Sequence, residues 1–154
     1  MLNIYKTEGG RVVPQDQLTP GCWVNVVEPT QQEIAYLTGE LGLDQDFVRS
    51  SLDEEESSRI EAEDNDQVLV IVDLPVAQRE GEEHSILYTT APMGIILPPD
   101  YVFTISTQPQ QVVGEMADGR VKNVTTHLRA RFLLSLLFRI ATRYLTYLKQ
   151  IDKI

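Results

Sequence analysis

The order of apolar segments along this chain predicts an α/β sandwich with a mixed sheet. Residues 2–5, 11–13 and 22–27 are rich in β-branched and aromatic side chains, which favours three early strands. Residues 68–72 (VLVIV) are apolar throughout, which is typical of a central strand covered on both faces. A long amphipathic segment closes the chain and predicts a helix. Three strands, two helices, four strands and a helix do not match a doubly wound parallel fold, in which strands and helices alternate.

Two helices are expected between the early strands and residue 68. Pro29 ends the third strand because proline cannot donate to a ladder, and Thr30 and Glu33 then have the spacing of a capping box. Gly42 ends this first helix. A second, short helix opens at Asp44. Their apolar residues are Ile34, Leu37 and Leu41 in the first and Phe47, Val48 and Leu52 in the second.

The second half of the sheet is expected at residues 68–72, 86–90, 94–97 and 102–106. Residues 80–83 (EGEE) predict a polar hairpin tip, and residues 98–100 (PPD) predict a tight turn between two apolar strands.

The closing helix is expected from about residue 124. On a helical wheel one broad arc is apolar and is expected to face the core. This arc contains Leu133, Leu134, Leu137, Ile140, Ala141, Tyr144, Leu145, Leu148 and Ile151. Phe132, Leu136 and Phe138 interrupt the opposite, basic side, so part of that side is expected to be covered too. No residue stops the helix, so we expect the natural chain to continue. We divide the chain into a core, 1–122, and this C-terminal helix, 123–154.

Charge and composition exclude several classes of protein. The 154 residues carry 23 acids and 13 Lys plus Arg, a formal net charge of −10. This argues against nucleic-acid binding and against broad contact with an anionic membrane surface. The single cysteine, Cys22, favours a reducing, cytosolic setting, and neither a secretory signal nor a membrane span is expected in this chain.

The charge divides sharply along the sequence. Residues 1–119 hold 22 acids and five bases, whereas residues 120–154 hold one acid and eight bases. Such a split suggests that the two parts face each other or face different neighbours.

Signatures of enzymes are scarce, and we expect no enzymatic activity. His84 and His127 are the only histidines, so a zinc site is not expected, and no nucleophile–base motif or phosphate-binding loop is present.

The acidic segment 44–66 has two interpretations. It contains ten acids and two bases, and carboxylates are the natural ligands of Mg²⁺ and Ca²⁺. Arg49 and Leu69 stand where EF-hand loops beginning at Asp44 and Asp64 would require glycine. The segment is therefore either a solvated acidic face that also pairs with Arg59, or a surface on which two or three acids join carboxylates of a neighbouring chain.

Taken in order, several stretches resemble the cytosolic N-terminal domain of CorA-type magnesium/cobalt transporters. They are residues 23–30 (WVNVVEPT), 41–44 (LGLD), 52–61 (LDEEESSRIE), 92–97 (PMGIIL), 101–105 (YVFTI) and 148–152 (LKQID). The resemblance implies an αβα sandwich with a mixed, largely antiparallel sheet. Its last helices would lead to a stalk and two membrane helices.

The same resemblance implies a function in divalent-cation transport. The family's pore signature, Gly-Met-Asn, is absent, so the chain is expected to be a fragment that does not conduct ions and reaches the membrane only through missing segments. Family members are homopentamers, and cytosolic Mg²⁺ bound between protomers keeps the channel closed. The expected role is a regulatory domain on the cytoplasmic side of the cell membrane. The alternative is a stand-alone acidic adaptor that binds a basic protein.

The family's regulatory acids fall at Arg49, Ser50 and Phe138 of this sequence, and none of these side chains binds Mg²⁺ as a carboxylate does. Asp46, Asp53 and Glu54 are therefore the expected metal ligands, unless this branch does not sense metal at this interface.

Overall fold

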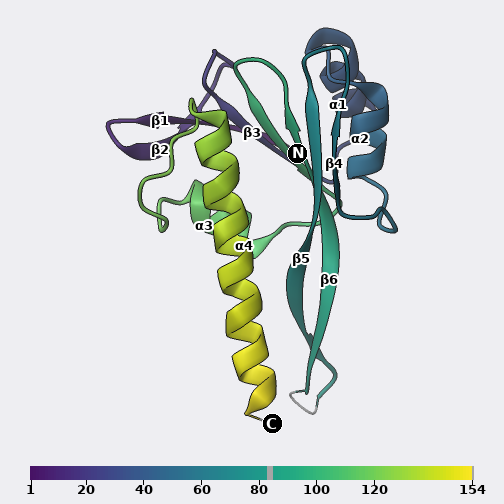
Figure 1. Ribbon diagram of the computed structural model, residues 1–154, viewed down its shortest axis with the longest axis vertical. Helices are drawn as coiled ribbons and strands as arrows, with labels where there is room; N and C mark the ends of the chain where they lie inside the picture. The colour runs from purple at the N-terminus through teal and green to yellow at the C-terminus, as the bar shows by residue number, and fades with distance from the viewer. Residues whose placement is uncertain (83–84, 154) are drawn as a thin grey trace.

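A single seven-stranded sheet forms the centre of the molecule (Figure 1). The computed structural model describes residues 1–82 and 85–153. The strands are β1 (Leu2–Glu8), β2 (Arg11–Gln15), β3 (Trp23–Val27), β4 (Arg59–Ala62), β5 (Val68–Glu80), β6 (Ser85–Leu97) and β7 (Val102–Ser106). They lie in the order β2-β1-β3-β7-β6-β5-β4, and the β3–β7 pair is parallel while the other pairs are antiparallel. The predicted mixed, largely antiparallel sheet is confirmed.

Helices cover both faces of this sheet. One layer contains α1 (Gln31–Ala35), the π-helical turn η1 (Tyr36–Glu40) and α2 (Gln45–Ser51). The other contains α3 (Gln111–Ala117) and the long α4 (Arg129–Asp152). The first layer buries Leu37, Phe47 and Val48 in one hydrophobic core, and the second buries Met116, Phe132 and Leu136 in another. The αβα sandwich is thereby confirmed.

Strand β5 shows how one strand serves both cores. Leu69 and Ile71 are buried with the α1–α2 layer, whereas Val70 and Leu74 are buried with the α3–α4 layer. Successive side chains of a strand point to opposite faces, so a strand covered on both faces needs a continuous apolar run. The prediction that both faces are covered is confirmed, although β5 lies next to the edge strand β4 rather than at the centre of the sheet.

Trp23 lies at the middle of the core beneath α4. Its side chain is fully buried, and its ring lies 4.9 Å from the ring of Phe132 and 5.0 Å from that of Tyr5. The indole Nε1 donates to Thr104 Oγ1 at 2.9 Å, and the Thr104 hydroxyl donates in turn to Asn25 Oδ1. Because a buried indole N–H needs an acceptor, this chain of hydrogen bonds permits a tryptophan here.

The hairpin of β5 and β6 is longer than predicted. Each strand has 13 residues, and pairing continues from Val68↔Leu97 to Glu80↔Ser85. The segments 86–90 and 94–97, expected as separate strands, are thus one strand. Figure 1 shows this hairpin extending below the body beside α4, where the Tyr88 hydroxyl donates to Gln150 Oε1. Glu83 of the predicted tip lies outside the described residues.

Sequence reasoning missed two elements and began the last helix too early. β4 and α3 were not expected, and α4 begins at Arg129 rather than near residue 124. The division of the chain at residue 122 remains a prediction.

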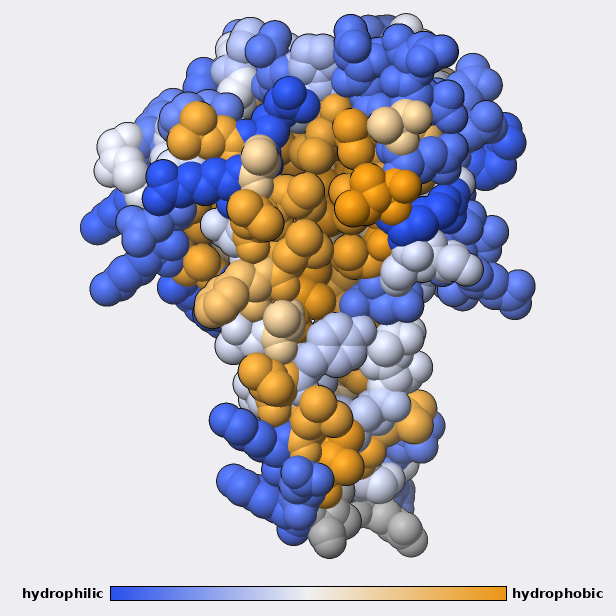
Figure 2. Space-filling view, viewed as in Figure 1, coloured by the Kyte–Doolittle hydropathy of each residue, from blue (hydrophilic) through white to orange (hydrophobic). Residues whose placement is uncertain are grey.

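The buried face of α4 is rotated from the predicted one. Phe132, Leu136 and Ile140 are buried, whereas Leu134, Leu145 and Leu148 of the predicted arc are 66%, 59% and 55% exposed. Part of the side that was expected to be basic and exposed thus faces the core. Arg139 and Arg143 are accommodated there because both pair with Glu115. Figure 2 shows apolar side chains gathered between α4 and the α1–α2 layer and continuing down the narrow lower part.

Candidate functional site

The acidic segment lies along α2, the turn after it, and the edge strand β4. Asp44 is the N-cap of α2, and its Oδ1 accepts hydrogen bonds from the backbone N–H groups of Asp46 and Phe47 at 2.9 and 3.1 Å. Its Oδ2 accepts from Asn65. Both oxygens of Asp44 are therefore engaged in holding the start of α2, which confirms the predicted helix start.

Arg59 neutralises part of this segment. Its guanidinium contacts the carboxylates of Glu56 and Glu61 and donates to Ser50 Oγ. The pairing of acids with Arg59 expected from the sequence is present. This network of ion pairs and hydrogen bonds around Arg59 connects the turn after α2 to strand β4. Asp53 and Glu54, which precede Glu56, lie outside the network.

The three predicted metal ligands lie on the surface of this layer. Asp46 is exposed and forms an ion pair with Arg49, in which Nη1 and Oδ1 are 3.1 Å apart. Asp53 follows the end of α2, and its Oδ1 accepts from the backbone N–H of Glu55. Glu54 is exposed beside it. Within residues 1–82 and 85–153, no three or more His, Cys, Asp or Glu side chains come together as a metal site. The assignment of these three residues as metal ligands stays a prediction.

Glu63 lies close to other carboxylates of the acidic segment. Hydrogen bonding with Glu61 raises the pKa of the Glu63 carboxyl, and desolvation and the charges of Glu61, Asp44 and Asp64 raise it further. The neighbouring carboxylates therefore act on Glu63 chiefly through this hydrogen bond, and their negative charge adds to it.

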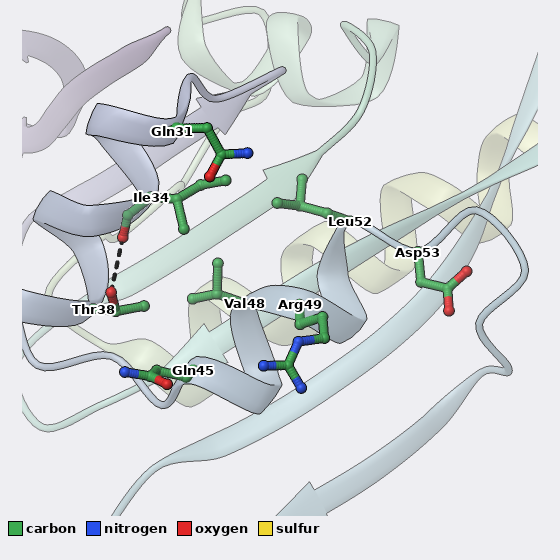
Figure 3. Close-up of a pocket in the computed structure, with 8 residues that line it drawn as sticks. All are labelled: Gln31, Ile34, Thr38, Gln45, Val48, Arg49, Leu52 and Asp53. Atoms are coloured by element: carbon green, nitrogen blue, oxygen red, sulfur yellow. Dashed lines mark hydrogen bonds between the residues drawn. The ribbon is translucent and has the colours of Figure 1, made fainter.

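A groove runs beside these acids, between α1, η1 and α2 (Figure 3). It has a volume of about 550 Å³. Figure 3 shows Ile34, Val48 and Leu52 gathered at its centre, while Arg49 and Asp53 point away from them. The groove thus has an apolar floor and a charged rim. Its lining is completed by Gln31, Thr38 and Gln45.

On the opposite face of the sheet, Glu115 of α3 binds two arginines of α4. Glu115 is 7% exposed; Arg139 Nη2 lies 3.1 Å from its Oε2, and Arg143 contacts its Oε1. Burial alone would raise the pKa of Glu115, but the hydrogen bonds and charges of Arg143 and Arg139 outweigh it and hold this pKa below its usual value. Sequence reasoning missed this ion triad; its one signal was a lone acid among the apolar and small residues 112–117.

The positions of Arg49, Ser50 and Phe138 lie apart in the chain. Arg49 and Ser50 are on α2, and Phe138 is on α4 on the other side of the sheet, where it is 70% exposed. A site that used all three positions would need more than one copy of the chain.

Comparison with protein families decides the family. The profile described as "CorA-like Mg2+ transporter protein" matches residues 20–154, which is most of the sequence. The chain belongs to the CorA-like family. The resemblance found in the sequence is confirmed, and the family is one of transporters rather than enzymes.

Solved structures of CorA-like proteins share the fold. The soluble domain of CorA from Methanocaldococcus jannaschii matches with a TM-score of 0.77 and 22% identity, over 99% of this chain and 60% of that one. The complete CorA magnesium transporter of the same organism matches with a TM-score of 0.75 and 19% identity, over 99% of this chain and 48% of that one. The ZntB cytoplasmic domain from Vibrio parahaemolyticus matches with a TM-score of 0.69 and 13% identity, over 98% and 62%.

This CorA-like chain thus spans about half to three-fifths of the length of those proteins. The comparison with curated protein sequences finds no match. In the part of the chain that the structure describes, no helix combines the length and apolar character that crossing a bilayer requires.

Proposed function

We propose that this chain is the regulatory domain of a CorA-like divalent-cation transporter, placed on the cytoplasmic side of the membrane and gating the pore in response to intracellular Mg²⁺. The observation that carries the proposal is the family match over residues 20–154. The cargo would be Mg²⁺ or Co²⁺, and the assembly a homo-oligomer, a pentamer as in the family.

The proposed mechanism is electrostatic. The acidic surface of one copy repels the acids of its neighbour, and a divalent cation between them converts repulsion into attraction. Loss of Mg²⁺ would then loosen the assembly and open the pore. In this proposal Asp53 and Glu54 of one copy join carboxylates of its neighbour, because carboxylate oxygens are the ligands that Mg²⁺ prefers.

Asp53 and Glu54 are the strongest of the proposed ligands in this chain. Both are exposed, and neither has an ion-pair partner among the described residues. Asp46 already faces Arg49, which competes with any bound cation. We therefore assign Asp46 a supporting role in the site.

Thermal unfolding in a Mg²⁺ titration at constant ionic strength tests this proposal. Binding to the folded state at ten times the dissociation constant should add about 1.4 kcal/mol and raise the unfolding midpoint by about 3–5 °C. The double variant Asp53→Asn/Glu54→Gln should lose this response. The matched control Glu80→Gln/Glu82→Gln, on the distal hairpin, should keep it. A midpoint that Mg²⁺ does not move beyond its ionic-strength control would remove the sensing role and leave the transporter assignment standing.

A further inference from the structure

A polar cleft separates the turn between β1 and β2 from the connection between α3 and α4. Its volume is about 680 Å³, which is within the usual range of small-molecule sites. Residues 10–12 line one wall, and residues of the segment 118–124 line the other. Figure 1 shows the connection running beside the β1–β2 hairpin, on the side of the molecule away from the α1–α2 layer. The cleft is therefore separate from the acidic segment.

Hydrogen bonds and core packing hold the two walls in place. The hydroxyl of Thr7, which pairs with Val12 in the β1–β2 ladder, donates to the Val124 carbonyl at 2.8 Å. The Thr7 backbone N–H donates to Thr126 Oγ1 at 2.9 Å, and the Thr126 N–H donates back to Thr7 Oγ1 at 3.0 Å. Val12 and Val121 both pack against the core beneath α4. The spacing of the walls is thus set by the fold.

Each wall contributes one base whose charge is not neutralised. Arg11 comes from the hairpin and Lys122 from the connection, and both are exposed. Within residues 1–82 and 85–153, neither side chain forms an ion pair. The cleft therefore presents positive charge from two opposite sides, in a chain whose net charge is −10.

The acids nearest these bases are engaged elsewhere. Asp118 is the acid of the lining; its Oδ2 lies 3.0 Å from Arg120 Nε, and its Oδ1 accepts from the Arg120 backbone N–H. Glu8 stands opposite Arg11 in the β1–β2 ladder, but its Oε1 accepts from Gln15 Nε2 at 3.3 Å. A ligand that brings its own negative charge can therefore pair with the two bases.

Two bases on opposite walls match a compact group that carries two negative charges. A phosphate monoester carries a charge of about −1.5 to −2 at neutral pH and three strong acceptor oxygens. The Arg11 guanidinium can bind two of these oxygens at once, and the Lys122 ammonium acts as a point charge. The cleft is larger than a phosphate group, so it has room for an organic part, to which the Asn123 amide offers a donor and an acceptor.

We propose that this cleft binds a small soluble phosphomonoester, with Arg11 and Lys122 holding the phosphate from opposite walls and Asn123 contacting the organic part. The site uses none of the acidic residues 44–66, so it stands independently of the proposed Mg²⁺ response. The bound ligand would connect the first hairpin to the segment that leads into α4.

A titration of the isotope-labelled chain with glucose 6-phosphate, followed by NMR in metal-free buffer at constant ionic strength, tests the site. We expect saturable shifts of the backbone amide signals of Gly10, Gly119 and Asn123. Arg11→Gln and Lys122→Gln should each raise the dissociation constant by about tenfold or more, because each removes a charge-assisted hydrogen bond. Inorganic phosphate should bind more weakly, since it fills only part of the cleft, and glucose, which lacks the phosphate, should not bind.

Matched substitutions distinguish this site from a general attraction of anions to bases. Arg79→Gln and Lys149→Gln remove exposed bases of the distal hairpin and of α4, and they should leave the dissociation constant unchanged. Shifts that rise linearly with concentration, or that all four variants weaken equally, would overturn the proposal. Loss of the amide signals on vesicles that contain phosphatidic acid, without a response to glucose 6-phosphate, would assign the bases to a membrane surface and overturn it too. Because no Mg²⁺ is present, failure here is distinguishable from failure of the Mg²⁺ response.

Discussion

Trp23 shows how much one side chain decides in this fold. Its ring joins the first hairpin, through Tyr5, to α4, through Phe132, and its N–H begins the hydrogen-bonded chain to Thr104 and Asn25. Residues from four segments far apart in sequence are therefore held by one buried indole.

Replacing Trp23 by alanine should lower the free energy of unfolding by about 3–5 kcal/mol, because it leaves a large cavity and removes the donor to Thr104. Phe138→Ala is the matched control, since it also removes an aromatic ring but from a side chain that is 70% exposed. It should change stability by less than about 0.5 kcal/mol. Urea denaturation measures both, and equal losses for the two variants would contradict the placement of Trp23.

Gly94 fixes how closely α2 approaches the sheet. A Cβ at this position would lie 1.8 Å from Ser51 Oγ and 2.9 Å from the Ser51 Cα, and Ser51 is itself buried with its hydroxyl donating to the Phe47 carbonyl. The glycine is thus required by contact rather than by an unusual backbone conformation. This close approach holds the C-terminal end of α2, which precedes the acidic residues 53–56, against strand β6.

Among the elements, those with local signals were predictable. The capping box of Thr30 and Glu33 is present at the start of α1, and the N-cap of Asp44 is present at α2. Both signals reside in a few neighbouring residues, so no tertiary contact is needed to recognise them.

The elements that sequence reasoning missed depend on tertiary contacts. α3 has no side-chain cap and contains Gly114, so local propensity opposes it; it is held by Val112, Val113 and Met116 in the core. β4 is a four-residue edge strand whose side chains are half-buried or exposed, so it lacks a strong apolar pattern.

Two prolines, Pro75 and Pro92, lie inside the strands of the long hairpin. Pairing of β4 with β5 ends at Arg59↔Ile71, and pairing of β6 with β7 ends at Met93↔Ser106. Pro75 and Pro92 lie beyond those points, where each strand has a single neighbour and a missing N–H breaks no ladder on the open side. Sequence alone does not show where neighbouring strands end.

The Glu115 triad links α3 to α4, and its stability should depend on pH. The arginines hold the pKa of Glu115 below its value in the unfolded chain, which is about 4.3. The stabilisation of the folded state by these ion pairs is therefore complete above the unfolded pKa and is lost as the pH falls through the folded pKa. Glu115→Gln should cost about 2–3 kcal/mol at pH 7, since it leaves two partly buried arginines without their counter-charge.

The matching measurement compares urea unfolding at pH 7 and at acid pH. The difference in stability between wild type and Glu115→Gln should shrink as the pH falls below the usual glutamate range. Glu82→Gln, an exposed control, should match wild type throughout. A difference that stays constant with pH would show that Glu115 is not the titrating group.

For the whole molecule, the net charge of −10 does not show how acidic and basic residues are distributed over the surface. The acidic residues 44–66 lie on α2 and the sheet edge, whereas the exposed base Arg131 lies on α4, which packs on the opposite face of the sheet. The sequence showed that charge is divided along the chain. It could not show that the sheet separates the two surfaces, nor that Arg139 and Arg143 turn inward to Glu115 while Arg131 stays exposed.

The proposed control of self-association by Mg²⁺ can be measured directly by sedimentation velocity. The chain is compared in two buffers of equal ionic strength, one with Mg²⁺ and one with EDTA and NaCl. We expect a larger assembled fraction in Mg²⁺, and we expect Asp53→Asn/Glu54→Gln to remove the difference. Identical mass distributions in the two buffers would contradict it.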